Sequence, residues 1–292
     1  MVIPLFKKDR PSHENRRPLV IAHRGASGLA PENTLAAFKL AIALGADGVE
    51  MDAQLSADNR AVVIHDARVN RTTNAVGLVE NFTASHLAEL DAGAWFDRRL
   101  AIRPRVRAMA AGANASARGN GLRFSGEPVP TLADALALLS RSKLQRIYIE
   151  LKGRQKNKQP LLEAIIALVR EFQLEQSVTL LSFDHEIIGL AARMAETIRR
   201  AATFSIAGRG SRSARSIIDS ATRVGAAEVA LHYGLATRRT VETLHESGIS
   251  VSAWTANTKL VMRRLAACGV DSIMTNFPNR LINALQSQGR GW

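Results

Sequence analysis

The chain has 292 residues, of which 46% are hydrophobic and 22% are charged, so a large buried core is possible and wholesale disorder is excluded. Its formal net charge of +13 suits anionic partners such as phosphorylated small molecules, anionic membrane surfaces or polyanions. The arginines are spread along the chain and aromatic residues make up only 5%, so nucleic-acid binding by base stacking is not expected. The single cysteine, Cys268, excludes a disulfide within one chain.

Residues 1–18 are interpreted as an N-terminal arm. They contain no apolar run long enough for a secretory signal peptide, because Lys7, Lys8, Asp9 and Arg10 interrupt the short apolar stretch there. No stretch of the sequence reaches the ~20 apolar residues of a membrane span. The sequence therefore predicts a soluble, cytoplasmic protein, unless a start codon further upstream adds a signal peptide. Peripheral contact with anionic lipid remains open, and the oligomeric state is not indicated.

Short β-branched or apolar runs alternate with segments of helical periodicity from residue 19 onward. Strands are predicted over residues 19–23, 48–55, 61–64, 146–151, 178–182, 200–204, 228–231, 249–254 and 271–274. Helices are predicted over residues 34–44, 131–140, 160–172, 185–195, 212–224, 238–247 and 259–267. Alternation of this kind favours right-handed βαβ units and a parallel sheet.

One predicted strand, 61–64, follows its predecessor too closely for a helix to intervene, and Asp58-Asn59 between them is typical of a turn. We therefore expect a β-hairpin in which Asp52 lies opposite His65 and Glu50 lies opposite Ala67. The other eight strands predict an α/β fold, a (β/α)8 TIM barrel. A doubly wound open sheet is the alternative, although no G-x-G-x-x-G loop follows the first strand.

Residues 92–130 form a long insertion before the next barrel strand, and we expect irregular structure there. Its arginines outnumber its acids Asp97 and Glu127; they are Arg98, Arg99, Arg103, Arg105, Arg107, Arg118 and Arg123. We expect the insertion to cap the substrate, with a tolerated surface loop as the alternative. The domain prediction is one unit over residues 19–285, followed by a tail over 286–292.

Acidic and basic residues gather where barrel strands are predicted to end, which is where TIM barrels carry their active sites. Glu50 and Asp52 are two apart on one strand and so face the same side, and Glu150 and Lys152 repeat the spacing. Three carboxylates on one face favour a hard divalent cation, Mg²⁺ or Ca²⁺. A structural Glu–Lys ion pair is the alternative.

Two histidines are predicted at strand ends beside these carboxylates. His23 ends the first strand and His65 ends the hairpin, so the pair is a candidate for a general acid and a general base. Arg24 adds a guanidinium fork suited to a phosphate group.

The chain resembles the glycerophosphodiester phosphodiesterase family, a metal-dependent group of TIM barrels. The resemblance runs from about residue 19 to residue 285 and rests on the following segments: "AHRGASGLAPENT", "GADGVEMDAQLSADNRAVVIHD", "NRTTNAVG", "LDAGAWFD", "VPTLADAL", "YIELKG", "LLSFD", "VSAWTAN" and "GVDSIMTNFP". It implies hydrolysis of glycerophosphodiesters to an alcohol and sn-glycerol 3-phosphate.

The resemblance also implies roles for individual residues. His23 and His65 match the catalytic histidine pair; Glu50, Asp52 and Glu150 match the ligands of one divalent cation; Arg24 and Lys152 match the phosphate-contacting residues; and Trp254 matches a pocket aromatic. Within "PENT", we expect Asn33 or Thr34 to cap a helix, with a supporting contact from Glu32 or Asn33 as the alternative. Asn276 stands where the family usually has Asp, which we expect to alter hydrogen bonding at the barrel rim.

Several questions stay open in the sequence. The nucleophile is water or the 2-hydroxyl of the substrate, and either histidine could start as the base. A phosphodiesterase acting on lysophospholipids or inositol lipids is an alternative function, and a non-catalytic phosphate-binding barrel is a further one.

Overall fold

Nine strands build the fold in a computed structural model that describes residues 17–113, 123–152, 157–207 and 213–287. Their bounds are β1 (Leu19–His23), β2 (Gly48–Leu55), β3 (Ala61–Val63), β4 (Arg146–Leu151), β5 (Val178–Ser182), β6 (Arg199–Phe204), β7 (Glu228–His232), β8 (Ser250–Trp254) and β9 (Ser272–Thr275). All nine lie where the sequence predicts strands.

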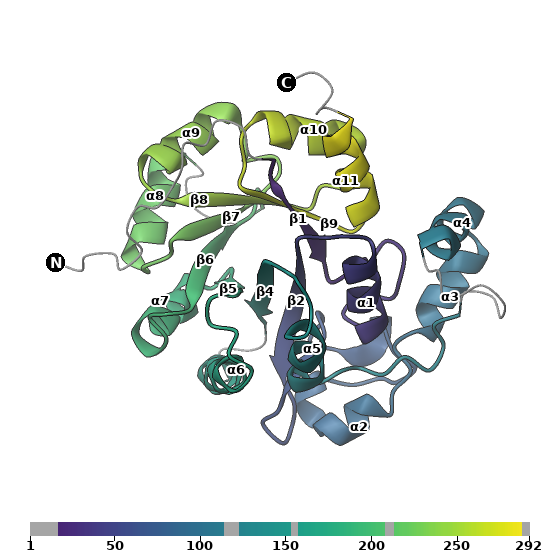
Figure 1. Cartoon of the computed structure of the whole chain (residues 1–292). Coiled ribbons are helices and arrows are strands. Elements are labelled where there is room, and N and C mark those ends of the chain that lie inside the picture. Colours follow the sequence, from purple (N-terminus) through teal and green to yellow (C-terminus); the bar gives the residue numbers. More distant parts are fainter. Residues whose placement is uncertain (1–16, 114–122, 153–156, 208–212, 288–292) are drawn as a thin grey trace.

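The strands form a closed parallel barrel with one antiparallel addition. Neighbours follow the order β1-β9-β8-β7-β6-β5-β4-β2-β3, and β1 pairs with β2 to close the ring (Figure 1). The closing seam pairs Ile21 with Gly48, Ala22 with Val49 and His23 with Glu50. The predicted TIM barrel is therefore confirmed, and the open sheet is excluded.

The hairpin is confirmed, but its predicted register is wrong by one residue. The structure pairs Ala53 with Val63 and Leu55 with Ala61, so Ile64, and not His65, lies opposite Asp52. The reason lies in the turn, where Ser56 N–H donates to the Arg60 carbonyl and encloses three residues, with Asn59 at φ 57°. A three-residue loop with a left-handed last residue shifts the pairing relative to a two-residue turn.

The helices surround the barrel (Figure 1). Those that match predicted helices are α1 (Leu35–Ala43), α5 (Leu132–Leu139), α6 (Lys158–Glu171), α7 (His185–Met194), α8 (Ala214–Arg223), α9 (Arg238–Glu246) and α10 (Lys259–Ala267). Polar side chains accept a backbone N–H at the start of most of them, and Thr131 with Asp134 forms a capping box on α5. Predicted helix residue Arg212 lies outside the described residues.

Further helical segments were not predicted: α2 (Ala84–Ala88), α3 (Ala94–Ala101), α4 (Pro104–Ala113), α11 (Pro278–Gln286), and the 3₁₀ turns η1 (Val69–Arg71) and η2 (Val79–Asn81). The insertion is thus helical over 94–101 and 104–113, which corrects the expectation of irregular structure. Phe96, Leu100 and Ala110 are buried against the main core, so tertiary packing outweighs the weak local pattern. In Figure 1, α3 and α4 lie outside the ring of helices, on the side where α1 and α11 are drawn, and Arg280 of α11 contacts the sulfur of Met109 in α4.

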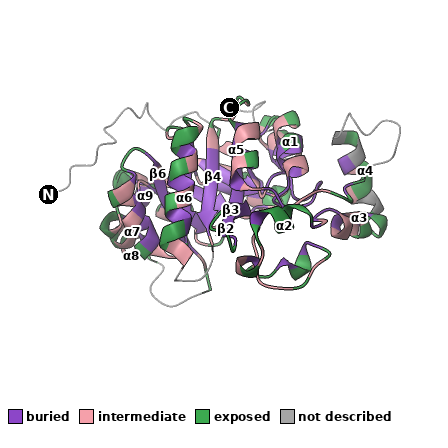
Figure 2. Cartoon of the chain, turned by 90° about the horizontal axis from the view of Figure 1, so that it is seen from below, coloured by how far each residue is buried: buried purple, intermediate pink, exposed green. Residues whose placement is uncertain are grey.

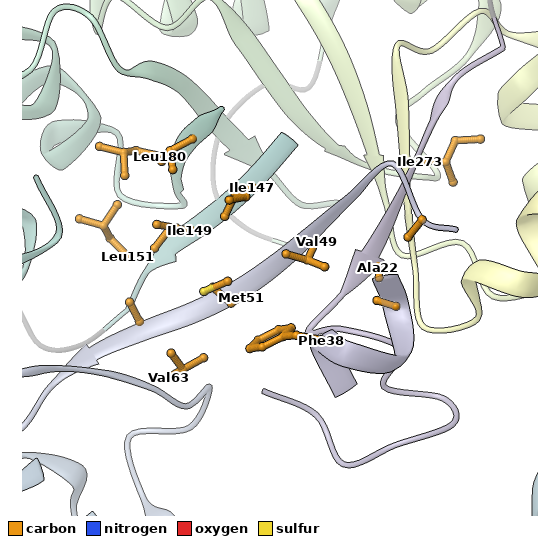
Figure 3. Packing of buried hydrophobic residues seen from close by; sticks show 14 of the residues in the cluster. Ala22, Phe38, Val49, Met51, Val63, Ile147, Ile149, Leu151, Leu180 and Ile273 are labelled. Atoms are coloured by element: carbon orange, nitrogen blue, oxygen red, sulfur yellow. The ribbon is translucent and has the colours of Figure 1, made fainter. Parts of the chain in front are cut away.

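Apolar residues fill the space between the barrel and the helices. Because side chains alternate along each strand, the residues between these apolar ones face the inside of the barrel. Val49 and Met51 on β2 and Ile147 and Ile149 on β4 pack outward with Phe38 of α1 (Figure 3). In the burial view the strands lie inside and the exposed helix faces outside (Figure 2). Because strand side chains alternate, Glu50, between Val49 and Met51, faces the interior. Among the described residues, no helix is both long and apolar enough to cross a membrane.

Candidate active site

Three buried carboxylates come together at the carboxyl end of the barrel. Glu50, Asp52 and Glu150 are 1%, 0% and 7% exposed, and one oxygen from each lies within 4.8 Å of the others. The ladder explains the arrangement, because β2 and β4 pair Asp52 with Glu150 directly, and Glu50 is two residues earlier on β2. The grouping predicted from the i, i+2 spacing is therefore present in the structure.

The carboxylates influence one another's ionisation. Burial, together with the charges of Asp52 and Glu150, raises the pKa of Glu50 well above its ordinary value. Burial and Asp52 raise the pKa of Glu150 to about 7. Burial would also raise the pKa of Asp52, but Arg24, Lys152 and His65 outweigh it and lower this pKa to about 2. Two of the three carboxyls are therefore harder to ionise than a free carboxyl, while Asp52 stays ionised.

The donor set fits a hard divalent cation. Glu50 Oε1 and Asp52 Oδ1 are buried without a hydrogen-bond partner in the described part of the chain. Buried polar atoms of this kind are rare unless a ligand satisfies them, and carboxylate oxygens are the atoms that Mg²⁺ and Ca²⁺ prefer.

Two basic side chains border the cluster. Lys152 Nζ lies 2.6 Å from Glu150 Oε1 and 3.4 Å from Asp52 Oδ1. Arg24 Nε lies 3.1 Å from Asp52 Oδ2, and its backbone N–H donates to Glu50 Oε2 at 2.9 Å. Arg24 has φ 56°, a left-handed conformation that turns the chain away from β1 and carries the guanidinium over β2.

His23 lies at the seam, beside Glu50. Its Nδ1 donates to Asn276 Oδ1 at 2.8 Å, and its Nε2 lies 3.9 Å from Glu50 Oε2. Burial, reinforced by the adjacent Arg24, lowers the pKa of His23 to about 4, so the ring is neutral at pH 7. Asn276 thus takes part in hydrogen bonding at the barrel rim.

His65 follows the end of β3. The side-chain amide of Gln54 on β2 lies 3.1, 3.0 and 2.6 Å from the carbonyl oxygens of Ile64, His65 and Asp66, to which it donates. These contacts hold the backbone that carries His65. The His65 Nδ1 donates to Asp66 Oδ1 at 2.5 Å. Sequence reasoning missed Gln54, whose only signal was its position two residues beyond Asp52 on the same strand face.

The "PENT" segment contains both of the roles considered for it. Thr34 caps α1 by accepting the Ala37 N–H, as expected. Asn33 and Glu32 make the supporting contacts: Asn33 Nδ2 donates to Asp52 Oδ2 at 2.8 Å, and Glu32 Oε1 accepts from Arg24 NH1 at 2.9 Å.

Trp254 ends β8, away from the carboxylate cluster along the rim. Its ring packs edge-on against Phe183 and His232, with centroids 5.4 Å away in both cases. Phe183 is 47% exposed, and Lys152 Nζ lies 5.7 Å from its ring centroid. Phe183 therefore lies between Trp254, the predicted pocket aromatic, and Lys152.

Comparison with known proteins agrees with this geometry. Residues 23–280 match the model of the "Glycerophosphoryl diester phosphodiesterase family". A glycerophosphodiester phosphodiesterase of Caldanaerobacter subterraneus subsp. tengcongensis is 33% identical over 276 residues, covering 94% of this chain and 100% of that one. The chain belongs to the glycerophosphoryl diester phosphodiesterase family.

Solved structures of similar proteins support the same assignment. A phosphodiesterase of Oleispira antarctica, in complex with the product sn-glycerol-3-phosphate, is 25% identical with a TM-score of 0.78, covering 92% of this chain and 97% of that one. A glycerophosphodiester phosphodiesterase of Agrobacterium tumefaciens is 28% identical with a TM-score of 0.70, covering 91% of this chain and 99% of that one.

Proposed function

We propose that this protein hydrolyses glycerophosphodiesters to an alcohol and sn-glycerol 3-phosphate with the help of one divalent cation. The observation that carries the proposal is the cluster of Glu50, Asp52 and Glu150, bordered by His23, Arg24 and Lys152 at one end of the barrel. Membership of the family and the product complex of the Oleispira protein support the choice of substrate.

In this proposal Glu50, Asp52 and Glu150 hold Mg²⁺ or Ca²⁺. A bound divalent cation offsets the negative charge of a phosphodiester and acts as a Lewis acid on the phosphoryl group. Arg24 and Lys152 border the same cluster and bind the phosphoryl oxygens, where they stabilise the charge that grows in the transition state. Trp254 contacts the carbon skeleton of the substrate.

The histidines move protons through their Nε2 atoms. Asn276 and Asp66 hold the two Nδ1–H groups, so in the neutral rings Nε2 carries the free lone pair. One imidazole accepts the proton of the nucleophile on Nε2, and the other, which enters the step as imidazolium, donates its Nε2 proton to the leaving alkoxide; each transfer contributes about 10²–10⁴-fold. The nucleophile is water or the substrate 2-hydroxyl.

A lipid substrate is a second candidate, because an apolar rim lies beside Trp254. Phe183 and Ile206 are 47% and 59% exposed, and Ile206 lies near Gly234 and His232, which contacts Trp254. Such a rim would accommodate the acyl chain of a lysophospholipid.

The test is turnover of glycerophosphocholine, glycerophosphoethanolamine and lysophosphatidylcholine by the purified full-length protein. Each assay is run after EDTA treatment and again with added Mg²⁺ or Ca²⁺. Release of choline or ethanolamine that EDTA abolishes and the cation restores is expected, with sn-glycerol 3-phosphate as the second product of the glycerophosphodiesters. The variant Glu50→Ala/Asp52→Ala controls for contaminating enzymes. Absence of turnover would favour the non-catalytic barrel, and a preference for the lysophospholipid would favour the second candidate.

A further inference from the structure

The segment "NRTTNAVG", over residues 70–77, has no place in the proposed mechanism, yet it is held firmly beside the site. Val69 is fully buried, its N–H donates to the Gly77 carbonyl, and its carbonyl accepts from both the N–H and the hydroxyl of Thr73. Asn70 Oδ1 accepts from Gly77 N–H at 3.1 Å. These contacts fix the backbone from which Arg71, the last residue of η1, extends.

Arg71 binds two carboxylates at once. NH1 and NH2 donate to Oε2 and Oε1 of Glu32 at 2.9 and 2.7 Å. Nε and NH2 donate to Oδ2 and Oδ1 of Asp66 at 2.6 and 3.2 Å. Four of the five N–H donors of the guanidinium are thereby used, and both contacts are of the bidentate kind that arginine makes best.

Each of these carboxylates also holds a residue of the proposed mechanism. Glu32 Oε1 accepts from Arg24 NH1 at 2.9 Å, and Arg24 in turn lies 3.1 Å from Asp52 Oδ2. Asp66 Oδ1 accepts from His65 Nδ1 at 2.5 Å. A continuous series of contacts therefore runs from Asp52 through Arg24, Glu32, Arg71 and Asp66 to His65.

We propose that Arg71 is a positioning residue that sets the orientation of Arg24 and His65 together, through Glu32 and Asp66. This inference rests on the proposed function, because Arg24 and His65 have their roles only in that reaction. Arg24 follows β1, whereas His65 follows β3, and the hydrogen bonds of the described residues do not join the two side chains directly. Arg71 joins the two positions with one rigid, planar group.

Glu32 and Asp66 are partly buried, with side chains 13% and 31% exposed. Without Arg71 they would repel each other; Asp66 would lose its arginine partner, and Glu32 would keep only Arg24. The Asp66 carboxylate could then rotate, and the His65 ring would no longer be held in the Nδ1–H form. Small displacements of reacting groups have large effects on rate, and supporting residues of this kind are worth about 10–100-fold.

The experiment compares Arg71→Met and Arg71→Lys with the wild-type protein, in the presence of Mg²⁺. Arg68→Met is the matched control, because Arg68 lies three residues earlier, is exposed, and makes no side-chain hydrogen bond or ion pair with the described residues. Circular dichroism and thermal unfolding confirm that each variant is folded. Two readouts are taken: kcat and KM on glycerophosphocholine, and ¹⁵N NMR of the histidine rings, with the His65 signals assigned from His65→Gln.

For Arg71→Met we expect kcat to fall about 10–100-fold with a smaller change in KM. We also expect the His65 signals to change from the Nδ1–H form to an exchanging mixture of both ring tautomers. Arg71→Lys should resemble Arg71→Met, because one ammonium cannot bind both carboxylates in the bidentate manner. Arg68→Met should match the wild type in both readouts.

Three results would overturn the proposal. A raised KM with unchanged kcat and unchanged His65 signals would show that Arg71 binds the substrate directly. Full recovery by Arg71→Lys would show that only its charge matters. Unaltered His65 signals in Arg71→Met would show that Asp66 needs no support. Wild-type inactivity towards every diester would instead refute the proposed function, while the NMR comparison would still decide whether Arg71 orients His65.

Discussion

Asn33 and Asp52 are joined by two hydrogen bonds, one to the backbone and one to the side chain. Asn33 Oδ1 accepts from the Asp52 N–H at 3.2 Å, and Asn33 Nδ2 donates to Asp52 Oδ2 at 2.8 Å. The seam with β1 ends at Glu50 and the pairing with β3 begins at Ala53, so β2 has no ladder partner for the Asp52 N–H on that side. The Asn33 side chain therefore accepts the hydrogen bond that a neighbouring strand would otherwise accept from the Asp52 N–H.

Replacing Asn33 by alanine should therefore lower both stability and cation affinity. Two hydrogen bonds to a buried residue are lost, and each buried group left unpaired costs about 1–3 kcal/mol. Asn33 also has φ 59°, which alanine adopts poorly. Asn33→Gly is the control for this backbone effect: if the amide is what matters, urea unfolding and Mg²⁺ titration should show losses in both variants. Recovery in Asn33→Gly would assign the effect to the backbone.

Replacing Glu50, Asp52 or Glu150 singly by alanine should reduce cation binding and turnover together. Each removes one carboxylate of a cluster whose oxygens lie within 4.8 Å. Asp52→Ala should have the largest effect, because Arg24 and Lys152 each also lose one of their carboxylate partners. Isothermal titration with Mg²⁺ and with Ca²⁺, alongside kcat/KM, measures the change. Turnover that survives exhaustive chelation in the wild type would contradict the cation's role.

Glu228 offers a test of pH dependence away from the site. It accepts from Tyr148 OH at 2.8 Å inside the barrel, and burial raises its pKa above the ordinary value. A raised pKa means that its favourable contribution is complete below the unfolded-state pKa and is lost as the pH rises through the folded-state pKa. Glu228→Gln stays neutral, so it should gain stability relative to the wild type as the pH rises from 4 to 8.

The free energy of unfolding in urea is measured for Glu228→Gln and for the wild type at several pH values. Glu242→Gln, a substitution of an exposed residue on α9, serves as the control. A constant difference between Glu228→Gln and the wild type at every pH would show that Glu228 does not titrate differently on folding.

Phe96→Ala should strongly destabilise the insertion. Phe96 is fully buried and packs edge-on against Trp95 and Phe124, whereas Ile102 at the end of the same helix is 79% exposed. Loss of a buried phenylalanine costs about 3–5 kcal/mol. Ile102→Ala is the matched control, and surface changes of this kind stay within about 0.5 kcal/mol. Proteolysis and thermal unfolding would distinguish the two, and equal effects would mean that the insertion does not pack as a unit.

The strands and the carboxylates were predictable because both depend on local pattern. Alternation along β2 places Val49 and Met51 outward, and this alone turns Glu50 and Asp52 inward. The hairpin was predictable from Asp58-Asn59, but its register was not, because one added loop residue shifts every pair.

Other features depend on contacts between distant segments and leave little local signal. α3 and α4 carry a weak pattern and are stabilised by packing, as Phe96 against Phe124 shows. The Asn33–Asp52 and Glu32–Arg71 contacts join residues 19 and 39 positions apart, so spacing could not reveal them. The N-cap Thr34, by contrast, was recognisable from residue type.

The pairing of β1 with β2 at the seam makes turnover a measure of barrel closure as well as of catalysis. His23 pairs with Glu50 in the last rung of that seam, and the same two residues carry the imidazole and a carboxylate of the proposed site. Circular closure of the barrel and assembly of the site are therefore one event. Consider a circularly permuted chain whose new termini lie between β1 and β2. It should form most of its secondary structure on its own, but it should turn over substrate only once β1 has paired with β2. Turnover would therefore report ring closure.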